Sequence, residues 1–432
     1  MNNSGSKSFR VFAKGYARSE NIWETGLNNN VVAVGNPGSG KTTGIVIPNM
    51  FATNGSIVVV DVKCQLHKKY ADMMSQRGYK VELMDFVNPE NSLPFNMLDT
   101  IRRTKKVHHI EYPGEHDEDG NIEVESYRQM DVQRLAAVLV PDNDSKDDRF
   151  WVTGARMMLE ALIAYVIEVL PKEEQNMGSV CLFFREMSDN MIHGHDVAFF
   201  KELEGINPDS FAVKKYRSFV SIFKSEKTWG CMMQFVSNAL SVFDPEENAQ
   251  MLCRSGIDLA GCGRQKTVLF VNVSDTDRAM DRVVNVFYTQ LIQVLVQEAD
   301  NNENGRLDVP CHIILDDFAC NVYVPDFDKL ISGVRSRDIS FTVILQSVSQ
   351  LRGMYNEGQA STIINGCDTV LFLGGTDPET GRFFADKAGK LPESLLSLDT
   401  DHLWIFTRGQ KPVLAEKIRS YETDLTEEDF WK

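Results

Sequence analysis

Closely spaced cysteine pairs are absent from the sequence. Its eight cysteines are scattered, none of them forms a C-x-x-C pair, and no cluster of Cys and His has the spacing of a zinc site. This pattern excludes a disulfide framework and a zinc-binding module. Buried, reduced thiols are the expected state, which indicates a protein of the cytosol.

An excess of positive charge is also absent. The formal net charge is −16 in 432 residues, which argues against a protein coated in nucleic acid. The acidic excess is concentrated, because residues 111–148 hold twelve Asp and Glu against three basic residues and contribute −9 of the total. The rest of the chain carries only −7, so a local basic channel is compatible with the sequence.

Long apolar runs and a signal peptide are absent as well. The most apolar segment, 157–170, contains Glu160 and Glu168 and is shorter than a helix that spans a bilayer. The chain is 43% hydrophobic and 25% charged, a balance typical of globular proteins. Because 432 residues exceed one ordinary hydrophobic core, we expect a soluble chain of two domains.

A glycine-rich phosphate-binding motif is the most informative feature that is present. It has the form G-x-x-x-x-G-K-T, follows the apolar strand 31–34, and precedes a helix that Pro48 should end or kink. Glycines let the backbone curl so that N–H groups point at phosphate oxygens, and the helix N-terminus favours negative charge. The predicted nucleotide-binding residues are Gly35, Asn36, Pro37, Gly38, Ser39, Gly40, Lys41, Thr42 and Thr43.

Two side chains of this motif have predicted chemical roles. Lys41 is expected to reach the β- and γ-phosphates, and the Thr42 hydroxyl is expected to ligate Mg²⁺. ATP and Mg²⁺ are therefore the expected cofactors. An ordinary glycine turn is the alternative, but the strand before the motif and the helix after it disfavour that interpretation.

Apolar β-rich runs alternate with helical segments, which predicts an α/β fold with a mostly parallel sheet. Residues 7–30 are expected to be an irregular lead-in, and the strand 403–407 is expected to lie at an edge of the sheet. The predicted strands cover 31–34, 56–61, 80–85, 267–273, 312–317, 340–346, 369–373 and 403–407.

Asp61 ends one of these strands, at the edge where α/β sheets bind ligands. Two interpretations remain open from the sequence. Asp61 contributes to the nucleotide site, or it caps the helix predicted over 65–78.

A second nucleotide-site motif begins at His312, where three apolar residues lead into Asp316 and Asp317. Asp316 is expected to hold Mg²⁺, directly or through water, and Asp317 to orient or deprotonate the attacking water. Gln346 ends the strand 340–346 and is expected to sense the γ-phosphate or position water. Its alternative role is that of an amide that stabilises a turn.

Arg335 and Arg337 end a helix just upstream of that strand. An arginine at this place could complete the site of a neighbouring subunit as an arginine finger. The alternative is a cation that interacts with the C-terminal end of the helix dipole.

The α/β pattern is interrupted in the middle of the chain. We expect a discontinuous nucleotide-binding domain over 1–125 and 262–432, with a loop or hairpin at 102–125, and an all-α domain over 126–261. Basic residues cluster in this helical domain, interleaved with aromatic ones. They form either a surface for nucleic acid or a partner, or a solvated helix face: Lys214, Lys215, Arg217, Lys224 and Lys227.

These motifs, in this order, resemble the type IV coupling proteins, the TraG/TraD-like ATPases of conjugation and type IV secretion, and among them members from Gram-positive mobile elements. The resemblance extends over nearly the whole chain. The matching stretches are Gly35–Thr42, Ser56–Lys63, Pro94–Asn96, Phe150–Trp151, Ile313–Ala319, Val334–Gln346, Gln350–Leu351 and Gly374–Asp377.

The resemblance implies a RecA-like P-loop NTPase domain that carries the all-α domain, and assembly into a homohexamer around a central channel. It implies a DNA-translocating ATPase at the cytoplasmic face of the cell membrane, which couples relaxase-bound single-stranded DNA to a type IV secretion channel. A membrane anchor would be missing from this chain or separate from it, because the transmembrane region usual in the family is absent from the sequence.

Two further departures from the family pattern concern the site. Lys63 is followed by Cys64, where the family commonly has Gly, and Asp317 stands where the family usually has Glu. The shorter acid leaves a second function open, that of a receptor platform that binds ATP and hydrolyses it slowly or not at all. A HerA/FtsK-like DNA pump is a third alternative, because it shares the motor.

Overall fold

The computed structural model describes residues 8–109, 121–142, 149–192, 197–222, 226–318 and 322–419. The described chain forms two compact units. The first unit lies within Met1–Asn91, Asp258–Val284 and Leu291–Lys432, and the second within Ser92–Ile257 and Asn285–Gln290.

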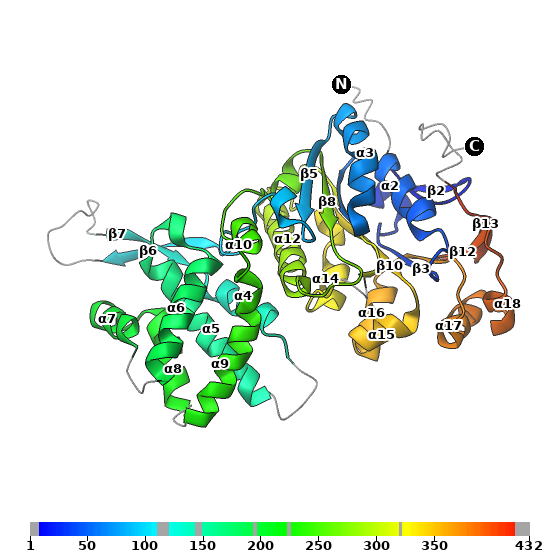
Figure 1. Ribbon diagram of the computed structural model, residues 1–432. Helices are drawn as coiled ribbons and strands as arrows, with labels where there is room; N and C mark the ends of the chain where they lie inside the picture. Colours follow the sequence, from blue (N-terminus) through cyan, green and yellow to red (C-terminus); the bar gives the residue numbers. More distant parts are fainter. Residues whose placement is uncertain are drawn as a thin grey trace, which may run out of the picture. The chain divides into compact units, whose positions relative to one another are not determined.

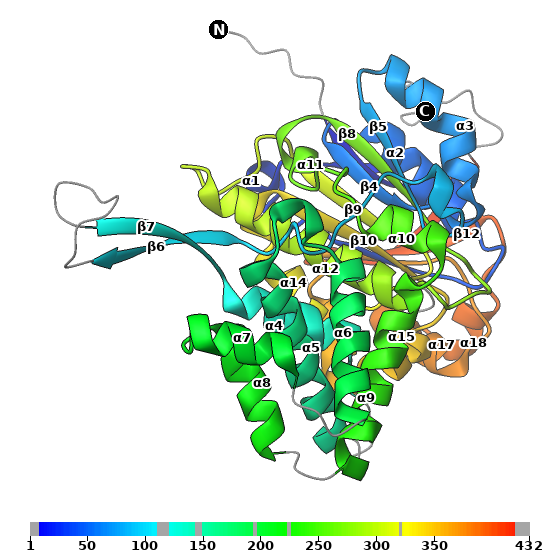
Figure 2. The same ribbon diagram turned by 60° about the vertical axis from the view of Figure 1, so that its left-hand side comes forward.

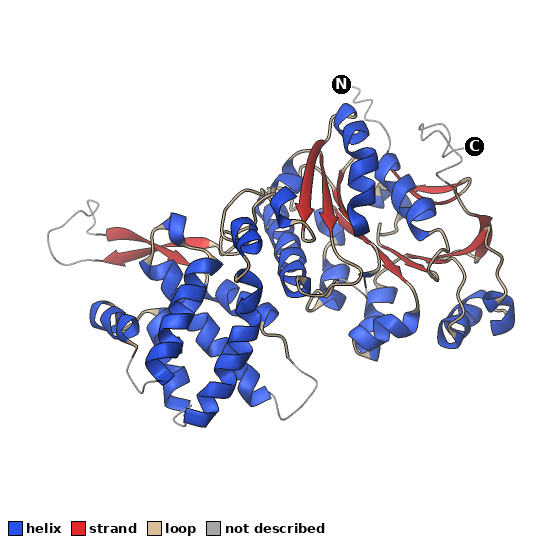
Figure 3. Ribbon diagram, in the orientation of Figure 1, coloured by secondary structure: helices blue, strands red, loops and turns tan. Residues whose placement is uncertain are grey.

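A nine-stranded sheet forms the centre of the first unit (Figures 1 and 3). Its seven strands from β11 to β5 are parallel, and β12 and β13 join one end in antiparallel fashion. The strand order is β13 (Val413–Glu416), β12 (His402–Thr407), β11 (Thr369–Phe372), β3 (Val31–Val34), β10 (Ile339–Leu345), β9 (Cys311–Leu315), β4 (Ser56–Val60), β8 (Thr267–Asn272) and β5 (Lys80–Asp85).

Every residue of β3, β4, β8 and β9 is buried, as expected of parallel strands that are covered on both faces. The predicted α/β fold with a mostly parallel sheet is therefore confirmed. The predicted edge position of the strand 403–407 is wrong, because β13 lies outside β12 and forms that edge.

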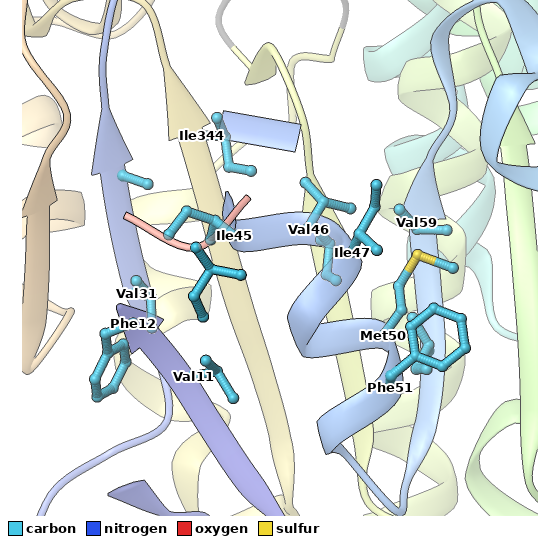
Figure 4. Packing of buried hydrophobic residues seen from close by; sticks show 14 of the residues in the cluster. Val11, Phe12, Val31, Ile45, Val46, Ile47, Met50, Phe51, Val59 and Ile344 are labelled. Carbon is cyan, nitrogen blue, oxygen red and sulfur yellow. The ribbon is translucent and has the colours of Figure 1, made fainter. Parts of the chain in front are cut away.

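One face of the sheet is covered by the segment after the phosphate loop. This segment consists of a π-helical turn, η1 (Thr42–Val46), and the helix α2 (Ile47–Ala52). Helix α3 (Gln65–Gln76) covers the same face. Figure 4 shows Ile45, Val46 and Met50 packed among side chains of β3, β4 and β10. The sequence predicted that Pro48 would end or kink this helix early, and Pro48 does not end it. It lies in the first turn of α2, where a missing N–H is tolerated, and the helix continues to Ala52.

The opposite face is covered by helices from the C-terminal half of the chain. Phe327 at the start of α14 (Phe327–Gly333) contacts Phe341 of β10, and Phe384 of α17 (Pro378–Ala388) stacks on Phe372 of β11. The other helical segments of this unit are α1 (Ile22–Thr25), η2 (Val62–Cys64), η3 (Pro89–Asn91), α11 (Gly261–Arg264), η6 (Arg335–Arg337), α15 (Val348–Met354), α16 (Glu357–Asn365), α18 (Pro392–Leu396) and most of α12 (Asp281–Asn301).

The lead-in is a β-hairpin and not the irregular segment predicted for 7–30. Strand β1 (Phe9–Ala13) pairs with β2 (Tyr16–Ser19), and Gly15 provides the positive φ of the turn between them. Val11, Phe12 and Ala13 are buried in the same core as η1 and α2 (Figure 4). Burial of these residues, rather than the alternation of the short strands, fixes the hairpin in place.

The second unit contains one β-hairpin and a group of helices (Figure 2). Its hairpin pairs β6 (Arg103–His109) with β7 (Asn121–Tyr127) in antiparallel fashion. The helical segments are α4 (Gln129–Leu139), α5 (Arg149–Val169), η4 (Lys172–Glu174), α6 (Met177–Ile192), α7 (Ala198–Ile206), α8 (Phe211–Ile222), α9 (Glu226–Leu240), η5 (Ser241–Phe243) and α10 (Glu246–Leu252).

The unit boundaries differ from the predicted domain boundaries at 125 and 261. The division falls at Asn91 and Ile257, so the segment from Ser92 and the hairpin belong to the second unit. Phe95 explains the shift, because its N–H donates to the Met251 carbonyl at 2.8 Å and its ring contacts Phe287. The periodicity of the sequence marks only where the helices begin. Phe95 precedes that point in the chain, so its membership of the second unit depends on tertiary contacts.

Helix α5 is longer than the predicted segment 157–170, and it is long and apolar enough to cross a membrane by length and composition alone. The length argument made from the sequence is therefore wrong. Most of the helix is buried within the second unit, where it contacts α4, α6, α8 and α9. The buried Glu160 pairs with Lys215, and the half-buried Glu168 accepts a hydrogen bond from Tyr127, so both acids of the helix have partners.

The basic residues of α8 pair with neighbouring acids: Lys214 with Asp209, Lys215 with Glu160, and Arg217 with Glu204. Aromatic side chains of the same helix turn inward. Tyr216 stacks on Phe200, and Phe219 is fully buried. Within the described residues this arrangement favours the solvated helix face. Lys224 and Phe223 lie outside the described residues, as does the side chain of Lys227.

Asn49 should be a major stabilising residue of the first unit. Its amide accepts from the Val11 N–H at 2.9 Å and donates to the carbonyls of Val11 and Ile45, both at 2.8 Å. Asn49→Ala leaves these buried backbone groups without partners, and we expect a loss of about 2–4 kcal/mol in the free energy of unfolding by urea. The matched control is Asn365→Ala on the exposed face of α16, which should change stability by about 0.5 kcal/mol or less. If the two substitutions change the free energy of unfolding equally, Asn49 is not a major stabilising residue.

Candidate nucleotide site

The candidate site lies where β3, β10 and β9, three neighbouring parallel strands, reach their carboxyl ends. Val34 of β3 is in register with Leu345 of β10, and Val343 of β10 with Leu315 of β9. The next residues of these strands are Gly35, Gln346 and Asp316. The sheet therefore brings together three sequence segments that lie far apart in the chain.

The phosphate loop needs glycine at three of its positions. A Cβ on Gly35 would lie 2.4 Å from Ser39 Oγ and 2.9 Å from Leu373 Cβ. Gly38 and Gly40 have φ values of +77° and +88°, which side chains rarely allow. Ser39 Oγ is buried and has no hydrogen-bond partner among the described residues, as expected of a hydroxyl in a loop that binds phosphate.

Lys41 lies across the loop from which it arises. Its side chain is 8% exposed, and Nζ donates to the carbonyl oxygens of Gly35 at 2.8 Å and Asn36 at 3.1 Å. These two carbonyls hold the ammonium group inside the loop. The amine is thus already positioned where a bound polyphosphate would pass.

Thr42 and Asp316 join the two motifs directly. Thr42 Oγ1 donates to Asp316 Oδ2 at 2.8 Å. Burial raises the pKa of Asp316 to about 6; the neighbouring charge of Asp317 also raises it, and the Thr42 hydrogen bond acts in the opposite direction. A hydroxyl and a carboxylate in contact form the hard oxygen pair that Mg²⁺ prefers.

Asp317 has an unusual backbone conformation for a residue that follows a strand. Its φ is +50°, in the left-handed region that Asp tolerates better than most residues, and its N–H donates to Asp316 Oδ1 at 3.1 Å. Gln346 Nε2 donates to Asp317 Oδ1 at 3.4 Å. The predicted water-activating acid and the predicted phosphate sensor therefore contact each other.

Asp61 is a helix cap. Its Oδ1 accepts from the Leu66 N–H at 2.8 Å and its Oδ2 from the His67 N–H at 2.7 Å, so both oxygens bind the first turn of α3. Of the two interpretations left open by the sequence, these bonds favour capping. The next residues carry strain, because Lys63 and Cys64 have φ values of +67° and +54°. Glycine, common in the family at the position of Cys64, would adopt that conformation without a steric penalty.

Arg335 and Arg337 lie at the other end of β10 from Gln346. The strand has seven residues and spans roughly 20 Å, beyond the reach of an arginine side chain. Arg337 binds Asp300 through Nε at 2.7 Å and Nη2 at 3.1 Å. Arg335 is exposed, and its Nη2 donates to the Gly26 carbonyl at 3.3 Å.

Sequence reasoning missed two groups beside the loop. Asn36 Nδ2 donates to Thr376 Oγ1 at 3.1 Å, and the Asn36 N–H donates to the Gly374 carbonyl, so the turn after β11 supports the phosphate loop. Lys417 is 7% exposed and donates to the Leu373 carbonyl at 2.8 Å. The position of Gly374 and Thr376 after a predicted strand could have identified the first group, whereas β13, which leads to Lys417, was not predicted.

The site resembles a nucleotide site more than a self-sufficient metal centre. Across the residues that the structure describes, no group of three or more His, Cys, Asp or Glu side chains could hold a metal ion. Mg²⁺ in phosphate-binding sites commonly takes only one or two protein ligands and the remainder from phosphate and water. Lys41, Thr42, Asp316, Asp317 and Gln346 converge at this edge of the sheet, whereas Arg335 and Arg337 do not.

The raised pKa of Asp316 predicts a dependence of stability on pH. Since this carboxyl binds its proton more tightly in the folded chain, the stability it adds is present at low pH and is lost as the pH rises through 6. Asp316→Asn should therefore gain about 2 kcal/mol in unfolding free energy over the wild type between pH 4.5 and pH 8, without nucleotide. Urea unfolding at both values measures this gain. Exposed Asp386→Asn is the control, and a gain as small as that of the control would contradict the buried state of Asp316.

Comparison with known proteins gives distant relatives, which include TraG and VirD4 proteins. The chain is 23% identical over 380 residues to the conjugal transfer protein TraG of Agrobacterium fabrum, and covers 51% of that protein with 84% of its own length. It is 20% identical over 365 residues to the protein VirD4 of Rhizobium radiobacter, and 82% of the chain covers 47% of that protein. The chain thus spans about half the length of these relatives.

Solved structures and a family model complete the comparison. The plasmid coupling protein TrwB in complex with ADP and Mg²⁺ matches with a TM-score of 0.65 at 15% identity, over 97% of this chain and 90% of that one. The RecA-like P-loop NTPase fold predicted from the sequence is therefore confirmed. The model of the family described as type IV secretory system conjugative DNA transfer matches residues 7–113 and 121–391, so the chain belongs to that family.

Proposed function

We propose that this chain is a Mg²⁺-dependent ATPase that drives DNA transfer through a type IV secretion channel. The observation that supports hydrolysis most strongly is the contact of Thr42 with Asp316 beside a phosphate loop that already holds Lys41. Family membership supports the coupling of that hydrolysis to conjugative DNA transfer.

In this proposal each group at the sheet edge has one role. The loop from Gly35 to Thr43 binds the phosphates, Lys41 neutralises the β- and γ-phosphates, and Thr42 and Asp316 hold Mg²⁺, which stabilises the charge that develops on phosphoryl oxygens. Asp317 orients or deprotonates the attacking water. Gln346 contacts Asp317 and so links the state of the γ-phosphate to the position of that acid.

The proposed substrate is a single DNA strand bound to a relaxase, delivered to the channel at the cytoplasmic face of the membrane. The working form in this proposal is a homohexamer. A receptor platform with slow or absent turnover is the second candidate function, and Asp317 in place of Glu is the residue that favours it.

An ATPase assay with and without single-stranded DNA tests the proposed function. We expect Mg²⁺-dependent hydrolysis that increases when the strand is added, and no hydrolysis by Lys41→Ala. If the chain binds ATP but does not hydrolyse it with or without single-stranded DNA, the proposed motor function is wrong and the receptor platform remains as the function.

Arg335 is the arginine that we propose to act on a neighbouring subunit. The length of β10 separates it from Gln346 of its own chain, so it cannot serve its own site. Arg337 is already bound at two nitrogens by Asp300, whereas Arg335 is exposed and makes one long hydrogen bond to a carbonyl. The exposed arginine can be redirected to a phosphate at little cost.

Arg335→Ala should reduce ATP turnover by about 10³-fold or more and leave nucleotide affinity unchanged, because an arginine finger acts in the transition state. Turnover of the assembled protein and binding of a fluorescent ATP analogue measure the two quantities. Arg337→Ala is the matched control and should retain most of the turnover. If Arg337→Ala is the inactive variant and Arg335→Ala is active, the assignment is reversed.

Asp317→Asn should retain ATP binding and lose hydrolysis, because the amide cannot accept a proton from water. Asp317→Glu should also slow turnover, because a positive φ disfavours Glu and the longer side chain alters the position of the carboxylate. Single-turnover measurements separate these effects from product release. An Asn variant with undiminished turnover would remove Asp317 from the reaction.

A further inference from the structure

A cavity of about 360 Å³ lies at the amino ends of the central strands, the opposite edge of the sheet from the phosphate loop. Asn30 before β3, Gly55 before β4, Cys311 of β9 and Ile339 of β10 line it. Arg10 of β1, Glu20 just after β2, and Ile22 and Trp23 of α1 also contribute to the wall. The volume lies within the range of cavities that bind small molecules. Of the residues that line it, the proposed ATPase reaction uses only Arg335.

Arg10 is the charged residue most deeply buried in the cavity wall. It is 1% exposed, and its Nη2 contacts Glu20 Oε1 at 2.8 Å and Ser340 Oγ at 3.2 Å. Its Nε and Nη1 are buried and have no hydrogen-bond partner among the described residues. A guanidinium keeps its charge in proteins, so donors without partners are costly unless an acceptor enters the cavity.

The cavity contains more cationic than anionic groups. Arg306 and Arg335 also line it, against the acids Glu20 and Asp338. Glu20 is already occupied, because it pairs with Arg10 and accepts from Ser8 and Thr53. Asp338 is 3.8 Å from Arg306 Nη1. The remaining positive charge favours a ligand with an anionic group.

An acceptor without a partner lies in the same wall. Asn29 Oδ1 is buried and has no hydrogen-bond partner among the described residues, while its Nδ2 donates to the Glu20 carbonyl at 2.7 Å. A ligand that satisfies both Asn29 and Arg10 must therefore carry a hydrogen-bond donor as well as an anionic acceptor. A simple carboxylate, which only accepts hydrogen bonds at neutral pH, lacks that combination.

Trp23 provides an aromatic surface at the cavity. Its side chain is 72% exposed, and the Arg306 guanidinium lies over the ring, 5.0 Å from the centroid. An exposed indole face can stack against a planar ring such as a nucleobase.

We propose that this cavity binds a free nucleoside 5′-monophosphate. The base stacks on Trp23 and donates to Asn29 through its amino group, and the phosphate accepts from Arg10 and Arg306. The proposal is independent of the ATPase reaction, because the cavity and the phosphate loop lie at opposite ends of the strands. It requires no residue of the phosphate loop.

Calorimetric titration of the full chain with AMP tests the proposal. AMP lacks the β- and γ-phosphates that the phosphate loop is proposed to bind, and the Lys41→Ala background further weakens nucleotide binding at that loop. We expect AMP to bind this variant, and Trp23→Ala and Arg306→Ala in the same background each to weaken the binding about tenfold. Tryptophan fluorescence should be quenched by AMP, and Trp23→Phe should abolish the quenching. Trp404→Phe, an equivalent substitution outside the cavity, should not.

Adenosine and inorganic phosphate are the control ligands, and each should bind at least tenfold more weakly than AMP. If adenosine binds as tightly as AMP, the phosphate group contributes nothing to binding. If inorganic phosphate binds as tightly as AMP, the base contributes nothing. Either result overturns the proposal. Unchanged AMP affinity in Trp23→Ala and Arg306→Ala also overturns it. If AMP does not bind to the Lys41→Ala chain at millimolar concentration, the cavity holds solvent only and the proposal is wrong.

Discussion

The hydrogen bond from Thr42 to Asp316 links two residues that are 274 positions apart in the chain, and the site depends on it. It forms because β3 and β9 flank β10 in parallel register, so that all three strands end at one edge. Displacement of any one strand by a residue would move each of its side chains to the opposite face of the sheet and separate the hydroxyl from the carboxylate. The buried sheet core thus maintains the geometry of the site.

The two ends of β10 have different chemistry. Gln346 follows its carboxyl end beside the phosphate loop, and Arg335 and Arg337 precede its amino end. Parallel strands impose this separation, because every strand contributes its last residue to one edge and its first to the other. A site that needs groups from both edges is completed only by a second subunit. The cavity around Arg10 lies at the arginine edge, where the central strands begin.

The sequence predicted the long, uniformly apolar strands and both nucleotide motifs, because burial on two faces leaves a continuous signal. It missed β1, β2 and β13, which are short and lie outside the parallel core, so their burial depends on tertiary contacts. The role of Asp61 could not be decided, because an acid after a strand serves equally as a helix cap or a ligand. Only the observed bonds to Leu66 and His67 distinguish the two.

The central claim is that one working site takes Lys41 from one subunit and Arg335 from its neighbour. Mixing Lys41→Ala subunits with Arg335→Ala subunits tests it most directly, because a mixed assembly contains interfaces at which both intact residues meet. ATP turnover should be absent from each variant alone and partly restored in the mixture. A mixture that assembles but remains inactive, or Arg335→Ala subunits that are active on their own, would contradict the claim.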